Sequence, residues 1–176
     1  YHGIHQDGKS SLLNNVVSII QKNANDYRVG KLNPKNMKIA AIIPIKGESI
    51  NLNGESLLKY TIDTLKKSKY IDEIIVSTDN QKTINLANKL GAKCPFIRPK
   101  KLSAPHINLE TVQQFSLNEL EKKSFFYDLI VHIEETFPFR PKNFIDEMIN
   151  YFLKNGLNTL VATKNEPKTI WREKNH

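Results

Sequence analysis

The chain has 176 residues and a formal net charge of +8, a length that suits one globular domain with its own core. No apolar run approaches the ~20 residues that a membrane-spanning helix needs, and no segment has the order of a signal peptide, so we expect a cytoplasmic protein without a membrane partner. Its single cysteine, Cys94, excludes an internal disulfide and a four-cysteine zinc site, and its apolar neighbours predict a small buried side chain.

The basic residues are spread along the chain among Asn and Glu, without a dense basic run. This pattern favours a solvated surface over a patch for nucleic acid, and we expect no nucleic-acid partner. A basic pocket for a phosphorylated or carboxylated small molecule is the remaining alternative.

Residues 1–36 differ from the rest and are expected to form an N-terminal helix with a linker or leader. Apolar side chains at near-helical spacing predict an amphipathic helix over Ser10–Lys22, and the polar stretch Asn23–Asn36 predicts the linker. Gly3–Ser10 matches the phosphate-loop pattern G-x-x-x-x-G-K-S of NTPases. No later apolar strand ends in an unassigned aspartate to complete such a site, and a capped helix start is the alternative.

From Lys38 onward, apolar runs alternate with amphipathic segments. The runs predict strands at Ile39–Ile45, Asp72–Ser77, Lys93–Ile97, Tyr127–Ile133 and Asn158–Thr163. The amphipathic segments predict helices at Glu55–Lys67, Gln81–Leu90, Leu109–Lys122 and Pro141–Lys154. This alternation predicts a doubly wound, mainly parallel α/β sheet with right-handed crossovers. In such sheets the ligand lies beyond the carboxyl ends of the strands.

The loop after the first predicted strand carries groups suited to a nucleotide or a sugar acid. Lys46 can neutralise a phosphate, Gly47 lets the backbone approach closely, and Ser49 can donate a hydrogen bond. After the second strand, Asp79 can accept from a hydroxyl or face a metal, or it can cap the next helix.

Two later loops add charged candidates. Arg98, in an I-R-P turn, suits bidentate contact with a phosphate or a base edge, with a surface ion pair as the alternative. Glu134 and Glu135 form a carboxylate pair that can hold Mg²⁺ or act as a general base; alternatively, one of them caps a helix or pairs with Arg140 and the other is solvated. The histidines lack metal-ligand spacing, and His132 within its strand predicts a packed core residue.

Four segments, spread over about residues 38–164, form a specific set: IAAIIP, LNGESLLKYTIDTLKKSKYIDEIIVSTDN, LANKLGAKCPFIRPKKLS and ETFPFRP. Together they resemble the CMP–N-acylneuraminate synthetases, the cytidylyltransferases that activate sialic acid and related nonulosonic acids. The resemblance implies a Rossmann-like nucleotidyltransferase domain over 37–176, truncated at its C-terminal end. It also implies transfer of CMP from CTP to a nine-carbon sugar acid, release of pyrophosphate, a need for Mg²⁺ and pairing into a homodimer.

The resemblance also implies roles for single residues. Lys46 stands where the family has an arginine of the phosphate-binding loop, and it is the residue we expect to act in catalysis. Ser49 matches that loop's serine, and Arg98 matches an arginine that contacts the nucleotide. Thr136 and Arg140 match the Thr and Arg of a Q-P-T-S-P-L-R loop that flanks base and sugar. The expected nucleotide-binding residues are Lys46, Gly47, Ser49, Asn53, Asp79, Arg98, Thr136 and Arg140, with the metal ligands left open.

The opening loop departs from the family pattern. Ser49 is followed almost directly by the Asn53-Gly54 pair, so the loop is several residues shorter and keeps Lys46 as its cation. Glu134 replaces a neutral Gln and Glu135 replaces a Pro. Since each lost charged hydrogen bond is worth about 1.5–3 kcal/mol, these departures predict weakened CTP binding. They leave open a non-catalytic nucleotide-sugar-binding or interaction module of the same family.

Overall fold

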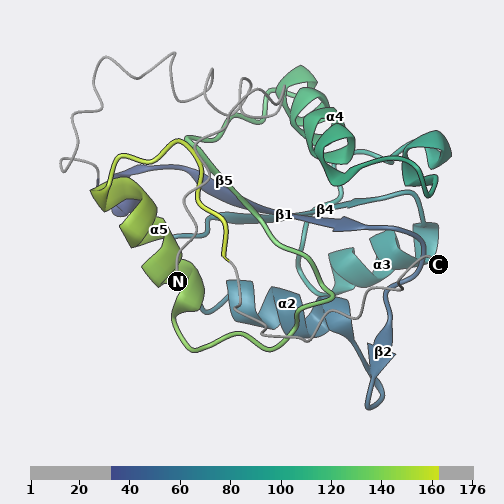
Figure 1. Ribbon diagram of the computed structural model, residues 1–176. Helices are drawn as coiled ribbons and strands as arrows, with labels where there is room; N and C mark the ends of the chain where they lie inside the picture. Colours follow the sequence, from purple (N-terminus) through teal and green to yellow (C-terminus); the bar gives the residue numbers. More distant parts are fainter. Residues whose placement is uncertain (1–32, 163–176) are drawn as a thin grey trace, which may run out of the picture.

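The computed structural model of the chain describes residues 33–162 (Figure 1). The predicted helix Ser10–Lys22 and the Gly3–Ser10 pattern therefore lie outside the described residues, as does most of the predicted linker. At the end of that linker, Pro34–Asn36 forms the short 3₁₀ helix η1.

A parallel sheet with strand order β4-β1-β5 forms the centre of the fold. Its strands are β1 (Ile39–Ile45), β4 (Glu73–Thr78) and β5 (Leu129–His132). In the central strand, Ala41 lies opposite Ile74 of β4 and Val131 of β5. Six of the seven β1 residues are buried, as expected for a parallel strand covered on both faces.

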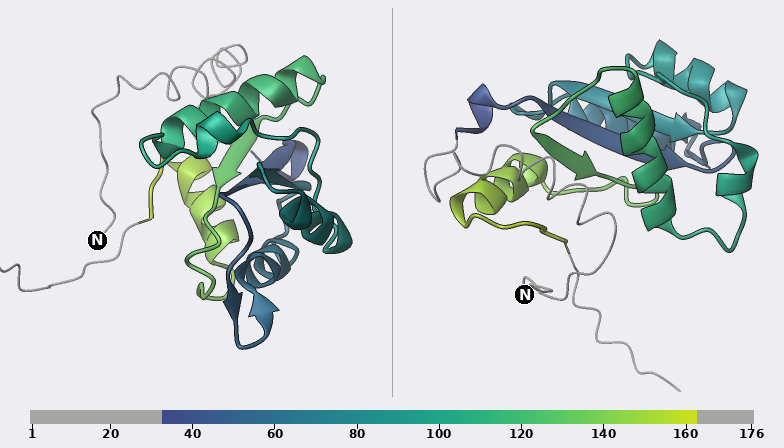
Figure 2. Two further views of the ribbon diagram at one scale, coloured as in Figure 1. Left: turned by 90° about the vertical axis from the view of Figure 1, so that its right-hand side faces the viewer. Right: turned by 90° about the horizontal axis from the view of Figure 1, so that it is seen from above.

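Helices cover both faces of the sheet (Figures 1 and 2). They are α2 (Leu57–Leu65), α3 (Gln81–Lys89), α4 (Leu109–Lys122) and α5 (Phe144–Lys154). Alternate side chains of β1 enter different cores: Ile43 packs with residues of α2, α3 and α5, whereas Ile42 packs with residues of α4. The predicted doubly wound α/β architecture is thus confirmed. None of the helices within residues 33–162 has the length and hydropathy needed to cross a bilayer.

Helix α3 begins and ends where its sequence predicts. The Asn80 side chain caps it by accepting from the N–H groups of Lys82 and Thr83. Gly91, at φ +80°, ends the helix in the left-handed region that favours glycine. Because Asn80 is the cap, the alternative cap role of Asp79 is wrong, and its carboxylate is available to other groups.

The predicted third strand, Lys93–Ile97, is wrong, because Lys93 alone forms a bridge, with Ile75 of β4. The Lys93 N–H donates to Ile74 and the Val76 N–H donates back to the Lys93 carbonyl. The next donor in a parallel ladder would be residue 95, which is a proline without an N–H. The ladder with β4 is therefore interrupted there, although the Arg98 N–H farther along donates to the Thr78 carbonyl at the end of β4.

Two other predicted elements differ from the structure. The predicted strand Asn158–Thr163 is wrong over residues 158–162, which form neither strand nor helix and are mostly exposed. The helix expected from Pro141 begins at Phe144 instead. Asn143 has φ +61°, which is not a helical conformation, so the helix cannot include the residues that precede Phe144.

Candidate functional site

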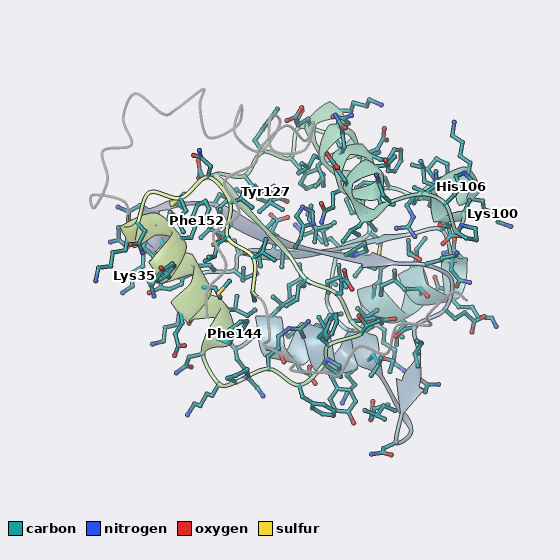
Figure 3. The ribbon with its side chains drawn as sticks, in the orientation of Figure 1. Lys35, Lys100, His106, Tyr127, Phe144 and Phe152 are labelled. Carbon is teal, nitrogen blue, oxygen red and sulfur yellow. The ribbon has the colours of Figure 1, made fainter. Side chains whose placement is uncertain are left out.

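The loops after β1, β4 and β5 meet at the carboxyl edge of the sheet, where a ligand is expected in this class of fold. Figure 3 shows Lys100 and His106 at this edge, with Lys35 and Phe152 at the opposite end. The expected nucleotide-binding residues fall into separate hydrogen-bonded groups here.

The first group fixes the loop after β1 to the end of β4. The Gly47 N–H donates to Asp79 Oδ1 at 3.1 Å, and the Thr83 hydroxyl donates to the Gly47 carbonyl at 2.8 Å. Gly47 has φ +68°, a conformation that glycine adopts without strain. Asp79, just after β4, and Thr83, in the first turn of α3, thus hold the N–H and the carbonyl of Gly47.

Arg98 lies beneath the same group and is only 3% exposed. Its guanidinium donates to the carbonyls of Ile45 at 2.6 Å and Ser77 at 3.1 Å, and to the Ser103 hydroxyl at 3.1 and 3.2 Å. The residue therefore joins the ends of β1 and β4 to the 3₁₀ turn η2 (Lys100–Ser103). Its burial excludes the alternative of a surface ion pair, and its contact with a nucleotide stays a prediction.

Asp79 and Arg98 form an ion pair of 3.7 Å in this buried setting. Burial opposes ionisation of Asp79, but hydrogen bonds from the Gly47 N–H and the Ser103 hydroxyl, together with the guanidinium, outweigh it and lower the pKa of Asp79. Burial lowers the pKa of Arg98, and the Asp79 charge offsets part of that effect. The carboxylate is thus held in its charged form.

The second group joins the same loop to the segment after β5. The Ser49 hydroxyl donates to Glu135 Oε2 at 2.6 Å and accepts from the Leu58 N–H at 3.2 Å. Glu135 is only 6% exposed. Burial raises the pKa of Glu135, against hydrogen bonds from Ser49 and the Ile50 N–H. Glu135 is therefore neither solvated nor paired with Arg140, and that predicted alternative is wrong for it.

The third group lies within the loop of residues 134–140. Arg140 donates to the Glu134 carbonyl at 2.6 Å, and the Thr136 hydroxyl donates to the exposed Glu134 carboxylate at 3.2 Å. The other terminal nitrogen of Arg140, Nη1, is buried without a hydrogen-bond partner in the described part of the chain. Burial lowers the pKa of Arg140, and the charge of Glu134 opposes this.

Lys46 and Asn53 stand apart from these groups. Lys46 is exposed, and its ammonium forms no ion pair with any residue among 33–162. Asn53 and Gly54 occupy the turn of a short hairpin, β2 (Asn51–Leu52) and β3 (Glu55–Ser56), with positive φ at both turn residues. The Asn-Gly pair is the usual signal for such a turn. Because Glu55 and Ser56 pair with β2, helix α2 starts later than predicted.

The described residues do not fit a magnesium site built by the protein alone. Within residues 33–162, no group of three or more His, Cys, Asp or Glu side chains is placed to hold a metal ion. The Asp79 carboxylate is engaged by Gly47 and Arg98, and the Glu135 carboxylate by Ser49. Magnesium in nucleotide sites relies largely on substrate phosphates. It therefore stays an expectation from the family resemblance.

Two titratable residues are partly buried beside the core, His132 and Cys94. Both ring nitrogens of His132 are buried and have no hydrogen-bond partner among residues 33–162, and burial lowers its pKa to about 4. Burial raises the pKa of the Cys94 thiol to about 11. At neutral pH both are uncharged, which agrees with their predicted packing roles.

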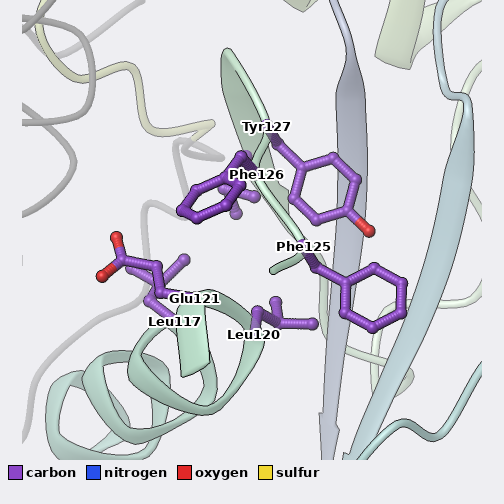
Figure 4. Close-up of a pocket in the computed structure, with 7 residues that line it drawn as sticks. Leu117, Leu120, Glu121, Phe125, Phe126 and Tyr127 are labelled. Atoms are coloured by element: carbon purple, nitrogen blue, oxygen red, sulfur yellow. The ribbon is translucent and has the colours of Figure 1, made fainter. Parts of the chain in front are cut away.

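A small apolar pocket lies at the other end of β5, away from the site (Figure 4). Its volume is about 30 Å³, close to that of one water molecule and too small for a nucleotide. It is lined by Leu117, Leu120, Glu121, Phe125, Phe126, Tyr127 and Ile130.

Residues 49–174 match the family model described as Cytidylyltransferase. The chain is 31% identical over 134 residues to a pseudaminic acid cytidylyltransferase of Campylobacter jejuni, an alignment covering 72% of this chain and 58% of that protein. It is 24% identical to a CMP-N,N'-diacetyllegionaminic acid synthase of Legionella pneumophila, covering 77% of this chain and 62% of that protein. The chain thus spans about three fifths of the length of these relatives.

A solved structure is similar in fold. A CMP:2-keto-3-deoxy-manno-octonic acid synthetase complexed with CTP aligns with a TM-score of 0.52 at 12% identity, over 65% of this chain and 47% of that one. At this identity the likeness concerns the fold alone, and it agrees with the predicted Rossmann-like nucleotidyltransferase sheet.

Proposed function

The chain belongs to the cytidylyltransferase family, and on that premise we propose that its site transfers CMP from CTP to a nonulosonic acid. The sugar-acid class rests on the pseudaminic and legionaminic acid enzymes among its relatives. The observation that carries the proposal is the loop after β1. Its donors, the Gly47 N–H and the Ser49 hydroxyl, are fixed at the carboxyl edge of the sheet beside the exposed Lys46.

In this reaction a hydroxyl oxygen of the sugar acid bonds to the α-phosphorus of CTP, and the bond from that phosphorus to the bridging oxygen breaks. Pyrophosphate leaves, and the hydroxyl proton is released. Such transfers depend mainly on positioning and on neutralising phosphate charge. Lys46 supplies charge at the phosphates, and the loop of residues 134–140 brings Thr136 and Arg140 to the adjoining strand end; the buried Arg140 Nη1 has no hydrogen-bond partner among residues 33–162.

A second candidate is a module that binds a nucleotide or nucleotide sugar without catalysis. The observation that favours it is that carboxylates of the protein already occupy the donors of the loop after β1: Asp79 accepts from Gly47, and Glu135 accepts from Ser49. A carboxylate beside a triphosphate also repels it. This arrangement weakens CTP binding relative to a loop with free donors.

Calorimetric titration with CTP, in the presence of Mg²⁺, tests whether the site binds its nucleotide. The proposal predicts saturable binding of CTP and weaker binding of ATP at the same concentrations. The absence of any heat of binding with CTP at millimolar concentration would contradict both the enzyme and the nucleotide-binding module.

A further inference from the structure

Internal carboxylates accept from two hydrogen-bond donors of the loop after β1. Asp79 accepts from the Gly47 N–H at 3.1 Å. Glu135 accepts from the Ser49 hydroxyl at 2.6 Å. A hydroxyl that donates to a carboxylate oxygen can equally donate to a phosphate oxygen. Glu135 therefore takes the place that an anionic ligand of this loop would take.

The two carboxylates differ in how firmly they are held. Asp79 has the Arg98 guanidinium at 3.7 Å as its counter-charge, besides its hydrogen bonds. Glu135 forms no ion pair with any cation among residues 33–162, although it is only 6% exposed. A buried carboxylate without a partner cation is poorly solvated. Moving it into water therefore costs less free energy than moving a carboxylate that also gives up an ion pair. Glu135 is thus the displaceable partner of the loop, and Asp79 is the fixed one.

The position of Glu135 in the chain allows such a displacement. It follows β5 in the segment of residues 134–140, which forms neither helix nor strand. The neighbouring side chains of Glu134 and Thr136 are already exposed. A rotation of this side chain toward solvent therefore disturbs no regular element.

We propose that Glu135 sets the affinity of the site for nucleotide phosphates, because its carboxylate occupies the Ser49 hydroxyl until a phosphate displaces it. The inference rests on the proposed function and deepens it by assigning an affinity-determining residue. Its consequence is that removing the Glu135 charge strengthens phosphate binding, which is the opposite of what removing a binding residue does.

Two variants separate the effect of the Glu135 charge from the effect of its hydrogen bond with the Ser49 hydroxyl. Glu135→Gln keeps an oxygen that can accept from Ser49 but removes the charge, and Glu135→Ala frees the Ser49 hydroxyl. We expect CTP to bind about tenfold more tightly to Glu135→Gln, equivalent to about 1.4 kcal/mol, and at least as tightly to Glu135→Ala. The matched control is Glu134→Gln, which removes the same charge from the adjacent exposed position and should change the affinity much less. Circular dichroism and thermal unfolding of each variant verify that it is folded.

A double-mutant cycle with Ser49→Ala identifies the contact itself. If Glu135 acts by occupying the Ser49 hydroxyl, the gain in CTP affinity from Glu135→Ala shrinks when that hydroxyl is absent. A gain from Glu135→Ala that is unchanged in the Ser49→Ala background, or equalled by Glu134→Gln, would reduce the effect to net charge and overturn the inference.

Titration with inorganic pyrophosphate as a second probe separates this inference from the proposed function. Equal CTP affinity in the native chain and both Glu135 variants overturns the inference and leaves the function standing. Tighter pyrophosphate binding in the Glu135 variants, without CTP binding in any of them, supports the inference and contradicts the function. No binding of either probe to Glu135→Ala, in folded protein, contradicts both.

Discussion

The Asp79 carboxylate accepts a hydrogen bond of 3.1 Å from the Gly47 N–H, although the two residues are 32 positions apart in the chain. This bond makes the loop after β1 part of the rigid end of the sheet. The same carboxylate faces the buried Arg98 guanidinium at 3.7 Å. Stability of the fold and geometry of the candidate phosphate loop therefore depend on one side chain.

Replacing Asp79 should test that dependence. Asp79→Ala leaves the Arg98 guanidinium buried without its counter-charge, so we expect a loss of about 3 kcal/mol in the free energy of unfolding. Asp79→Asn keeps an acceptor for the Gly47 N–H and should lose less. Urea denaturation measures both. The control is Asp63→Ala, whose side chain is 49% exposed and forms an ion pair of 3.8 Å with Lys59; an equal loss in this variant would contradict the role of Asp79.

His132 predicts a pH dependence of stability. Its pKa is lowered to about 4 in the folded state, so the unfolded chain takes up the proton first as the pH falls. The stability present above about pH 6.5 should be lost progressively toward pH 4, by about 3 kcal/mol in total. His132→Leu should remove this part of the pH dependence and raise stability at neutral pH, because the buried ring nitrogens have no hydrogen-bond partner within the described part of the chain. Urea denaturation of both proteins across this pH range checks the difference, and parallel curves would contradict it.

The sequence predicted an element correctly where one local property, such as an apolar run or a capping residue, determines its bounds. The seven-residue run Ile39–Ile45 is apolar throughout and forms β1 with the predicted bounds. Leu109–Lys122 follows Asn108, whose side chain caps α4 as such a residue should. Pro95 has no N–H to donate, which argues against a strand over Lys93–Ile97. The apolar residues around it nevertheless led to that prediction.

The partners within the site could not be read from the sequence. Ser49 and Glu135 are 86 positions apart, and only the parallel pairing of β1 and β5 brings the segments after them together. Nothing in the local pattern around Glu135 distinguishes it from the exposed Glu134 beside it. Likewise, the burial of Arg98 follows from the packing of η2 against two strand ends, which is a property of the tertiary fold.

The hairpin turn before α2 offers a test of backbone strain alone. Gly54 has φ +83°, and a Cβ added there would meet no atom within 4 Å. Gly54→Ala should therefore reduce the free energy of unfolding by about 1 kcal/mol through its left-handed backbone, not through a clash. Gly54→Asn should lose less, because Asn tolerates this conformation. Equal losses in thermal unfolding would argue against this explanation.

Lys46 is expected to act on the ligand and not on the fold. It is exposed and forms no ion pair among residues 33–162, so Lys46→Ala should leave thermal stability unchanged. Its loss should weaken CTP binding about tenfold or more, because a charged contact to phosphate is removed. The matched control is Lys35→Ala in η1, an exposed lysine at the opposite end of the sheet (Figure 3). Unchanged affinity in Lys46→Ala would remove this residue from the site.

The proposed transfer reaction is tested most directly by pyrophosphate release. The native chain is incubated with CTP, Mg²⁺ and pseudaminic, legionaminic or N-acetylneuraminic acid in turn, and Lys46→Ala serves as the matched variant. The proposal predicts release that requires both CTP and one of the sugar acids and that falls in Lys46→Ala. CTP binding without release, with every sugar acid, would contradict the transfer reaction and favour the non-catalytic module.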